Sequence, residues 1–274
     1  MEKTLYVTDL DGTLMRDDKS ISEKTVAIIN KLIARGVFIT YATARSMNSA
    51  SVITEKINFQ IPAIIRNGTI LANTRTKEEI ERAVFTEESV RSLRKYMEEY
   101  VQKIPGYVTS YINGIEKKLY LKQVTNDGFE HYLKDHASDK RLCAVEAEED
   151  LYVGEVCYFT FIADKEQLEP LYQQVKDKND WICVYQQDKY RKEYWLEICP
   201  QDATKATAIQ KLQKRYGCEK VVVFGDSLND VPMFQMADEA YAVANAMESL
   251  KAIATGVIGE NNDDGVAKWL DANV

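Results

Sequence analysis

The sequence predicts an α/β protein: a doubly wound parallel sheet into which a second domain of α+β type is inserted. The first 81 residues alternate apolar strand-like runs with helical segments, and the same alternation is found after Pro200. Between these parts, several strand-like runs alternate polar with apolar residues, as strands of an antiparallel sheet with one solvated face do. We therefore expect a core domain formed by residues 1–81 and 195–274, and an inserted domain formed by residues 82–194.

The elements of the first third are expected in the order strand, helix, strand, helix, strand. This order predicts a parallel sheet with right-handed crossovers. Ser22 is a typical helix start and Gly36 a typical helix stop, whereas Asn67-Gly68 is a turn signal. The predicted elements are the strand Thr4–Thr8, the helix Ser22–Arg35, the strand Val37–Ala42, the helix Met47–Ile57 and the strand Ala63–Arg66.

The rest of the chain divides into an inserted part and a returning core. In the inserted part we expect the helices Thr86–Val101, Gly128–His136 and Lys165–Lys178, and strands that include Val108–Ile112, Lys118–Val124 and Val156–Ile162. In the returning core we expect the helix Lys205–Tyr216, the strand Lys220–Phe224, the helix Val231–Met236 and the short strands Tyr241–Val243 and Gly256–Ile258.

Composition favours a globular cytoplasmic protein. The 274 residues are 45% hydrophobic, and the formal net charge of -8 includes no concentrated basic segment, so we expect no nucleic-acid partner. No apolar run approaches the length of a membrane span, and Asp9 and Asp11 interrupt any signal-peptide core. Five cysteines without a CxxC pair are typical of reduced thiols. We expect a monomer or a weak dimer.

The stretch YVTDLDGTL raises the question of function. A strand that looks buried ends on two aspartates, Asp9 and Asp11, although Asp-Gly alone could simply mark a turn. Thr43 ends a second strand and Asp226 follows a third, while Lys205 lies in the first turn of a helix. Because ligands of open parallel sheets bind beyond the carboxyl ends of the strands, these residues are expected to converge there.

Four motifs in this order resemble the haloacid dehalogenase superfamily of phosphatases: DLDGTL, Thr43 within YATAR, Lys205 within DATKA, and GDSLND at Gly225 to Asp230. The inserted domain, NGT at Asn67 and NNDDGVA at Asn261 to Ala267 are similar to the Cof-type subfamily with a C2 cap. The resemblance implies a Rossmann-like core, an α+β cap and phosphatase activity. Asp202 and Ala206 stand where the family commonly has glycine.

The residue types fit phosphoryl transfer. A carboxylate attacks an anionic phosphoryl group only if positive charge offsets the repulsion, and a divalent metal and a lysine supply that charge. Asp9 is the expected nucleophile, and Asp11 the expected acid and then base. Oxygen ligands suit Mg²⁺, so we expect Asp9, the backbone carbonyl of Asp11 and Asp226 to bind it.

Phosphate contacts are expected from several residues around this pair. Thr43 would donate its hydroxyl, and Lys205 would hold both phosphate and Asp9. The resemblance implies contacts from Leu10 and Asn229 as well.

Other polar residues have alternative interpretations. By resemblance, Asp230 orients Lys205 or a metal-bound water, but its position before Val231-Pro232 is equally typical of a helix N-cap. Arg45 either lies at the edge of the site or is solvated near a helix start. Asp202 is read as a helix cap.

The sequence thus predicts a Mg²⁺-dependent phosphatase that hydrolyses small phosphorylated metabolites through an aspartyl-phosphate. One alternative is a sugar phosphomutase of the same superfamily, which returns the phosphoryl group to its substrate. Another is a sensor of phosphorylated metabolites that does not turn over. The presence of Asp9, Asp11, Lys205 and Asp226 together argues against the sensor, because a binding protein would not need both carboxylates.

Overall fold

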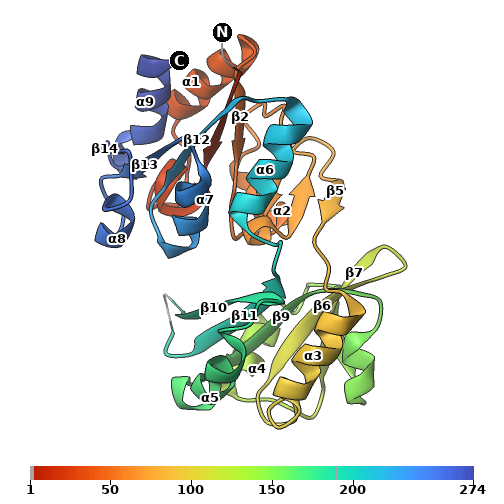
Figure 1. Cartoon of the computed structure of the whole chain (residues 1–274). Coiled ribbons are helices and arrows are strands. Elements are labelled where there is room, and N and C mark those ends of the chain that lie inside the picture. The colour runs from red at the N-terminus through yellow and green to blue at the C-terminus, as the bar shows by residue number, and fades with distance from the viewer. Residues whose placement is uncertain (1–2, 189–190) are drawn as a thin grey trace. The chain divides into compact units, whose positions relative to one another are not determined.

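The computed structural model describes residues 3–188 and 191–274. The chain forms two compact units (Figure 1). The first unit consists of Met1–Arg82 and Asp202–Val274, and the second of Ala83–Gln201. The predicted return to the core at residue 195 needs correction, because residues 195–200 belong to a strand of the second unit, β11 (Tyr194–Pro200).

A five-stranded sheet forms the centre of the first unit, in the order β14-β13-β12-β1-β2 with every neighbour parallel. Thr8 at the end of β1 pairs with Phe224 in β12 and with Tyr41 in β2, so the carboxyl ends of these three strands lie at one edge. The strands are β1 (Thr4–Thr8), β2 (Phe38–Tyr41), β12 (Lys220–Gly225), β13 (Glu239–Val243) and β14 (Gly256–Ile258).

Helices cover both faces of this sheet. Trp269 of α9 packs against the rings of Tyr6, Phe224 and Tyr241, which alternation places on one face. Gly225 belongs to the opposite face, where Phe234 of α7 lies so close that a Cβ on Gly225 would be 2.8 Å from its ring. The predicted doubly wound α/β fold is therefore confirmed. The helices are α1 (Glu23–Ala34), α2 (Met47–Ile53), α6 (Lys205–Tyr216), α7 (Val231–Met236), α8 (Glu248–Lys251) and α9 (Gly265–Asn273).

The strand predicted at residues 63–66 is shorter and pairs differently from the expectation. It forms a small antiparallel sheet, β3 (Ala63–Ile65), β4 (Ile70–Ala72) and β5 (Glu79–Arg82), which a parallel bridge from Ala42 to Ile64 joins to the chain after β2. The reason is the turn Arg66–Gly68, whose residues all have positive φ and reverse the chain.

The second unit is a six-stranded sheet in the order β10-β11-β9-β6-β7-β8, antiparallel except for the parallel pair β7-β8. One face carries Phe159 and Trp181, which pack against Phe85 before α3 and Tyr96 within it. The strands are β6 (Gly106–Ile112), β7 (Ile115–Leu121), β8 (Leu142–Val145), β9 (Glu155–Ala163), β10 (Trp181–Gln187) and β11; the helices are α3 (Glu87–Met97), α4 (Asp127–Asp135) and α5 (Lys165–Val175).

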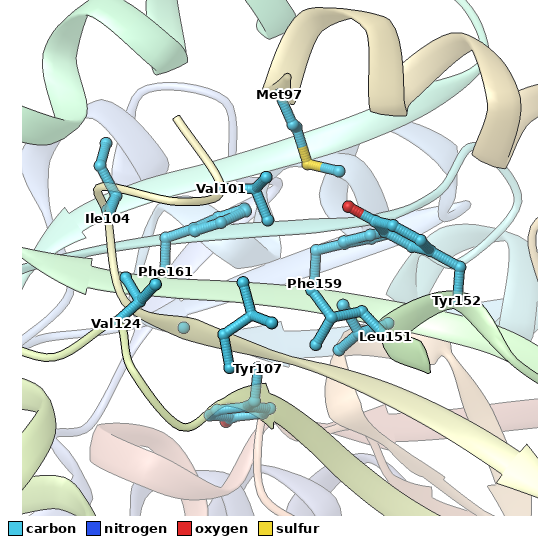
Figure 2. Close-up of a pocket in the computed structure, with 12 residues that line it drawn as sticks. Met97, Val101, Ile104, Tyr107, Val124, Leu151, Tyr152, Phe159 and Phe161 are labelled. Carbon is cyan, nitrogen blue, oxygen red and sulfur yellow. The ribbon is translucent and has the colours of Figure 1, made fainter. Parts of the chain in front are cut away.

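A small cavity lies in the core of the second unit. Figure 2 shows apolar side chains such as Val101, Leu151, Phe159 and Phe161 around it. Its volume of about 20 Å³ has room for roughly one water molecule, and its lining offers few polar partners. We regard it as a packing defect rather than a ligand site. Within the described part of the chain, no helix combines the length and the apolar character needed to cross a membrane.

Candidate active site

Three of the predicted residues lie together at the carboxyl edge of the main sheet. Asp9 directly follows β1, and its backbone N–H donates to the carbonyl of Phe224 in β12 at 2.9 Å. Thr43 follows β2 and is fully buried, with its N–H donating to Ile64 at 2.8 Å. Asp226 follows β12. The parallel register of the strands therefore brings these residues, distant in sequence, to one place.

Lys205 links two buried carboxylates at this edge. Its Nζ donates to Oδ1 of Asp9 at 2.5 Å and to Oδ1 of Asp230 at 2.7 Å. Lys205 is the first residue of α6, and the Thr204 side chain caps that helix by accepting from the N–H of Thr207. Gly68 permits this arrangement, because a Cβ there would lie 2.0 Å from the carbonyl oxygen of Thr204.

The two carboxylate oxygens of Asp230 accept hydrogen bonds from different groups. It is fully buried, and while Oδ1 accepts from Lys205, Oδ2 accepts from the N–H groups of Asp226 at 3.0 Å and Ser227 at 3.1 Å. It makes no side-chain cap to α7. Of the two interpretations of Asp230 from sequence, the contacts match the one in which it orients Lys205, and they also fix the loop that carries Asp226.

The cluster contains more negative than positive charge. Lys205 faces Asp9 and Asp230, and Asp226 adds a third carboxylate. Burial, with the charges of Asp230 and Asp226, raises the pKa of the Asp9 carboxyl to about 8, although Lys205 opposes the shift. Burial disfavours the charged amine of Lys205, but Asp230 and Asp9 outweigh it and raise its pKa. Such a cluster favours an additional positive charge.

The donor set suits a hard divalent cation. Ligand oxygens of Asp9, Asp226 and Asp230 lie within 4.8 Å of one another, and oxygen ligands are those that Mg²⁺ prefers. Thr13 donates its hydroxyl to Oδ1 of Asp226 at 3.0 Å. Gly12 has φ of +80°, and a Cβ there would lie 2.6 Å from Oδ2 of Asp226, so only glycine fits this turn.

Asp11 forms a bidentate ion pair with Arg45. The guanidinium donates from Nε to Oδ2 of Asp11 at 2.7 Å and from Nη2 to Oδ1 at 2.5 Å. The side chain of Asp11 is 41% exposed, and that of Arg45 is 21% exposed. Arg45 also donates from Nη1 to Ser49 at 2.9 Å and from its backbone N–H to Thr43 Oγ1 at 3.1 Å. Arg45 thus lies at the edge of the site and binds both carboxylate oxygens of Asp11.

Asn229 is oriented by two side chains. Its Nδ2 donates to Oδ1 of Asn67 at 3.2 Å, and its Oδ1 accepts from the hydroxyl of Ser227 at 2.6 Å. Asn67 itself has φ of +54°, and its N–H donates to the carbonyl of Thr43 at 3.0 Å. The turn Arg66–Gly68 therefore connects the loops that carry Thr43 and Asn229.

Comparison with known proteins places the chain in a family. The pattern of the haloacid dehalogenase-like hydrolase family matches residues 6–270. The chain belongs to that family. This finding confirms the resemblance inferred from the four motifs.

Relatives of this hydrolase match along nearly the whole chain. The 5-amino-6-(5-phospho-D-ribitylamino)uracil phosphatase YitU of Bacillus subtilis is 25% identical over 97% of this chain and 96% of its own. The HMP-PP phosphatase of Klebsiella pneumoniae is 24% identical over 97% and 96%. The crystal structure of TM0651 from Thermotoga maritima superposes with a TM-score of 0.76 at 26% identity, covering 100% of this chain and 98% of that one.

Leu10, predicted for the site, and Asp202, predicted as a helix cap, have different surroundings from those expected. The side chain of Leu10 is fully buried in the core, so only its backbone could contact a phosphate. The prediction that Asp202 caps α6 is wrong, because Thr204 is the N-cap residue. Oδ2 of Asp202 lies 3.7 Å from Nζ of Lys211 instead. Sequence reasoning missed Thr13, although it belongs to the DLDGTL motif and its hydroxyl could have indicated a contact.

Proposed function

We propose that this hydrolase is a Mg²⁺-dependent phosphatase that cleaves small phosphorylated metabolites through an aspartyl-phosphate on Asp9. The observation that carries the proposal is the cluster of the buried Asp9 and Asp230, both bound by Lys205, with the half-buried Asp226, because its excess negative charge needs a cation. The phosphatase names of the two relatives support the same reaction class.

Asp9 has the position of a nucleophile. Its carboxylate oxygen would form a bond to phosphorus while the bond from phosphorus to the leaving oxygen breaks. Lys205 fixes Oδ1 of Asp9, and Asp230 in turn fixes Lys205. When bound by Asp9, Asp226 and the backbone carbonyl of Asp11, Mg²⁺ supplies positive charge that offsets the repulsion between carboxylate and phosphate.

Asp11 would carry the proton. In the first step its carboxyl gives a proton to the leaving alkoxide, and in the second its carboxylate takes a proton from the water that attacks phosphorus. The products are an alcohol, inorganic phosphate and free Asp9. Arg45 donates one hydrogen bond to each oxygen of Asp11, so the proton transfer would take place on the lone pairs that Arg45 leaves available.

The remaining polar residues would bind the phosphate. Thr43 and Asn229 offer a hydroxyl and an amide at the same edge as Asp9. We assign the chemistry to the first unit, and we propose that the second unit is the cap that selects the substrate. Its sheet and helices contain none of the residues assigned here to catalysis.

A hydrolysis screen tests the proposal. The purified protein is incubated with sugar phosphates, nucleotides and phosphorylated cofactors, and released phosphate is measured with Mg²⁺, with Ca²⁺ and with a chelator. We expect turnover with Mg²⁺, none with the chelator, and much less with Ca²⁺, which prefers more ligands at longer distances. Asp9→Asn is the control for contaminating phosphatases. Equal phosphate release from Asp9→Asn, or isomerised sugar without free phosphate from a hexose 1-phosphate, would contradict the proposal.

A further inference from the structure

The segment NNDDGVA has no part in the chemistry proposed above. It spans the turn Asn261–Asp263 and the beginning of α9. Asn261 is buried, and its Nδ2 donates to the carbonyl of Met15 at 2.9 Å and to Oδ1 of Asp17 at 3.0 Å. The segment is therefore bonded to the chain directly after the turn Leu10–Leu14, which contains Asp11.

Asn245 extends this connection to the turn itself. Its Oδ1 accepts from the backbone N–H of Asn261 at 3.0 Å, and its Nδ2 donates to the carbonyl of Gly12 at 2.7 Å. The turn Leu10–Leu14 is thus held at Gly12 by Asn245, and the residue that follows it, Met15, is held by Asn261.

The loop that contains Asn245 also holds the opposite side of the carboxylate cluster. The backbone N–H of Met247 donates to the carbonyl of Asp226 at 2.9 Å. The carboxylate of Asp226 in turn lies against Gly12 and accepts from Thr13. Residues 245–247 are therefore bonded to both parts of the chain whose separation decides how far Asp226 lies from Asp9.

We propose that Asn245 is a positioning residue that fixes the turn Leu10–Leu14 against Asp226 and thereby sets the affinity of the carboxylate cluster for a divalent cation. It acts through the carbonyl of Gly12 and touches no reacting atom. The physical reason is that Asp9 and Asp226 repel each other, so a site that keeps them close needs bonds that resist their separation. The inference rests on the proposed function only in assigning a cation to these carboxylates.

The expected size follows from one lost hydrogen bond. A net contribution typical of such a bond changes an equilibrium constant roughly fivefold to tenfold. Asn245→Ala should therefore weaken Mn²⁺ binding to the metal-free protein by roughly that factor. Because the effect acts through metal affinity, a higher Mg²⁺ concentration should restore kcat, while the KM of an aryl phosphate at saturating Mg²⁺ should not change.

Asn262→Ala is the matched control. Asn262 lies next to Asn261, is exposed, and donates to Oδ2 of Asp17 at 2.8 Å, but none of its hydrogen bonds described by the structure reaches the turn Leu10–Leu14. Asn245→Gln is a second variant, because it keeps the amide and displaces it by one methylene. Asn245 is exposed, so both of its variants should fold.

The experiment titrates the metal-free wild-type protein and the three variants with Mn²⁺ alone and records their thermal unfolding. We expect weaker binding in both Asn245 variants and wild-type affinity in Asn262→Ala, with similar unfolding midpoints. Wild-type affinity in Asn245→Ala, or an equal loss in Asn262→Ala, would overturn the inference. A wild-type protein that releases no phosphate would overturn the proposed function alone, because the Mn²⁺ titration does not depend on turnover.

Discussion

Each unit of the molecule contains a buried lysine among carboxylates, and the two clusters differ in their balance of charge. Lys205 faces Asp9 and Asp230, with Asp226 beside them. In the second unit, Lys118 donates to the hydroxyl of Tyr132 at 2.7 Å and lies 3.2 Å from Asp139.

The contacts of Asp139 complete a neutral cluster. Arg141 donates to Asp139 from Nε at 2.7 Å and from Nη2 at 2.8 Å, and it reaches Glu116 at 3.0 Å. Among the contacts described, Lys118 and Arg141 face Asp139 and Glu116 in the second unit, whereas in the first unit Lys205 faces Asp9 and Asp230 with Asp226 close by. A balanced network stabilises a fold, whereas an unbalanced one needs a further cation and indicates a functional site.

The largest predicted effect comes from Asp9→Asn. Turnover should fall by at least about a thousandfold, because the amide cannot attack phosphorus. In the metal-free protein, Asp9→Asn removes excess negative charge and should therefore increase the free energy of unfolding. Each kcal/mol of this increase should raise the unfolding midpoint by roughly 2–4 °C. Asp139→Asn should do the reverse: turnover stays within about twofold and stability falls. The comparison fails if Asp139→Asn lowers turnover as Asp9→Asn does, or if both variants shift the unfolding midpoint in the same direction.

The second prediction compares the two lysines. Lys205→Met should destabilise the protein by about 3–5 kcal/mol, because buried carboxylates lose their cation, and it should also abolish turnover. Lys118→Met should cost only about 1–2 kcal/mol, because Arg141 still binds Asp139. Urea titration and turnover of an aryl phosphate measure both. Equal losses of stability would mean that charge balance does not distinguish the clusters.

The third prediction concerns acid. Burial acts to raise the pKa of Asp139, but the hydrogen bonds from Arg141 and the charge of Lys118 outweigh it and lower that pKa well below 3.8. A depressed carboxyl pKa gives stability that is present above the unfolded value and is lost as pH falls through the folded value. The stability advantage of wild type over Asp139→Asn should therefore shrink below about pH 4. Urea titrations at several pH values test this, and a constant difference would refute it.

The smallest predicted effect concerns the cavity of the second unit. Val101→Ile adds one methylene beside a space of about 20 Å³ and should stabilise the protein by about 0.5–1 kcal/mol without changing turnover. The same change at Val52, which is 68% exposed, is the control and should have almost no effect. Destabilisation by Val101→Ile would show that the cavity wall cannot accept the added group.

Local signals in the sequence were sufficient for elements that local interactions define. The helix α6 has the predicted bounds because Thr204 caps it and Gly217, at φ of +60°, ends it. The helix α2 ends at Ile53 rather than at the predicted Ile57. No stop signal comparable to Gly217 follows Ile53, so the sequence did not indicate this end. Residues 195–200 were assigned to the core because no strand was recognised there, and they form β11 in the sheet of the second unit.

The candidate site could be predicted where topology decides it. Asp9, Thr43 and Asp226 were grouped because parallel strands end at one edge. The ion pair between Arg45 and Asp11 could not be predicted from the sequence, since it depends on side-chain rotamers. Asn245 was missed although it follows β13 at the same edge as Asp226, and that position is the signal that could have found it.

The order of strands in the main sheet has a consequence for synthesis on the ribosome. β1 lies between β2 and β12, and Lys205 is 196 residues from the Asp9 that it binds. A nascent chain that has emerged up to residue 201 holds the whole second unit but only part of the sheet. At ordinary elongation rates, synthesis of the remaining strands of the first unit takes on the order of ten seconds. The bond between Lys205 and Asp9 therefore cannot form until α6 has emerged, which happens only after the second unit has been synthesised.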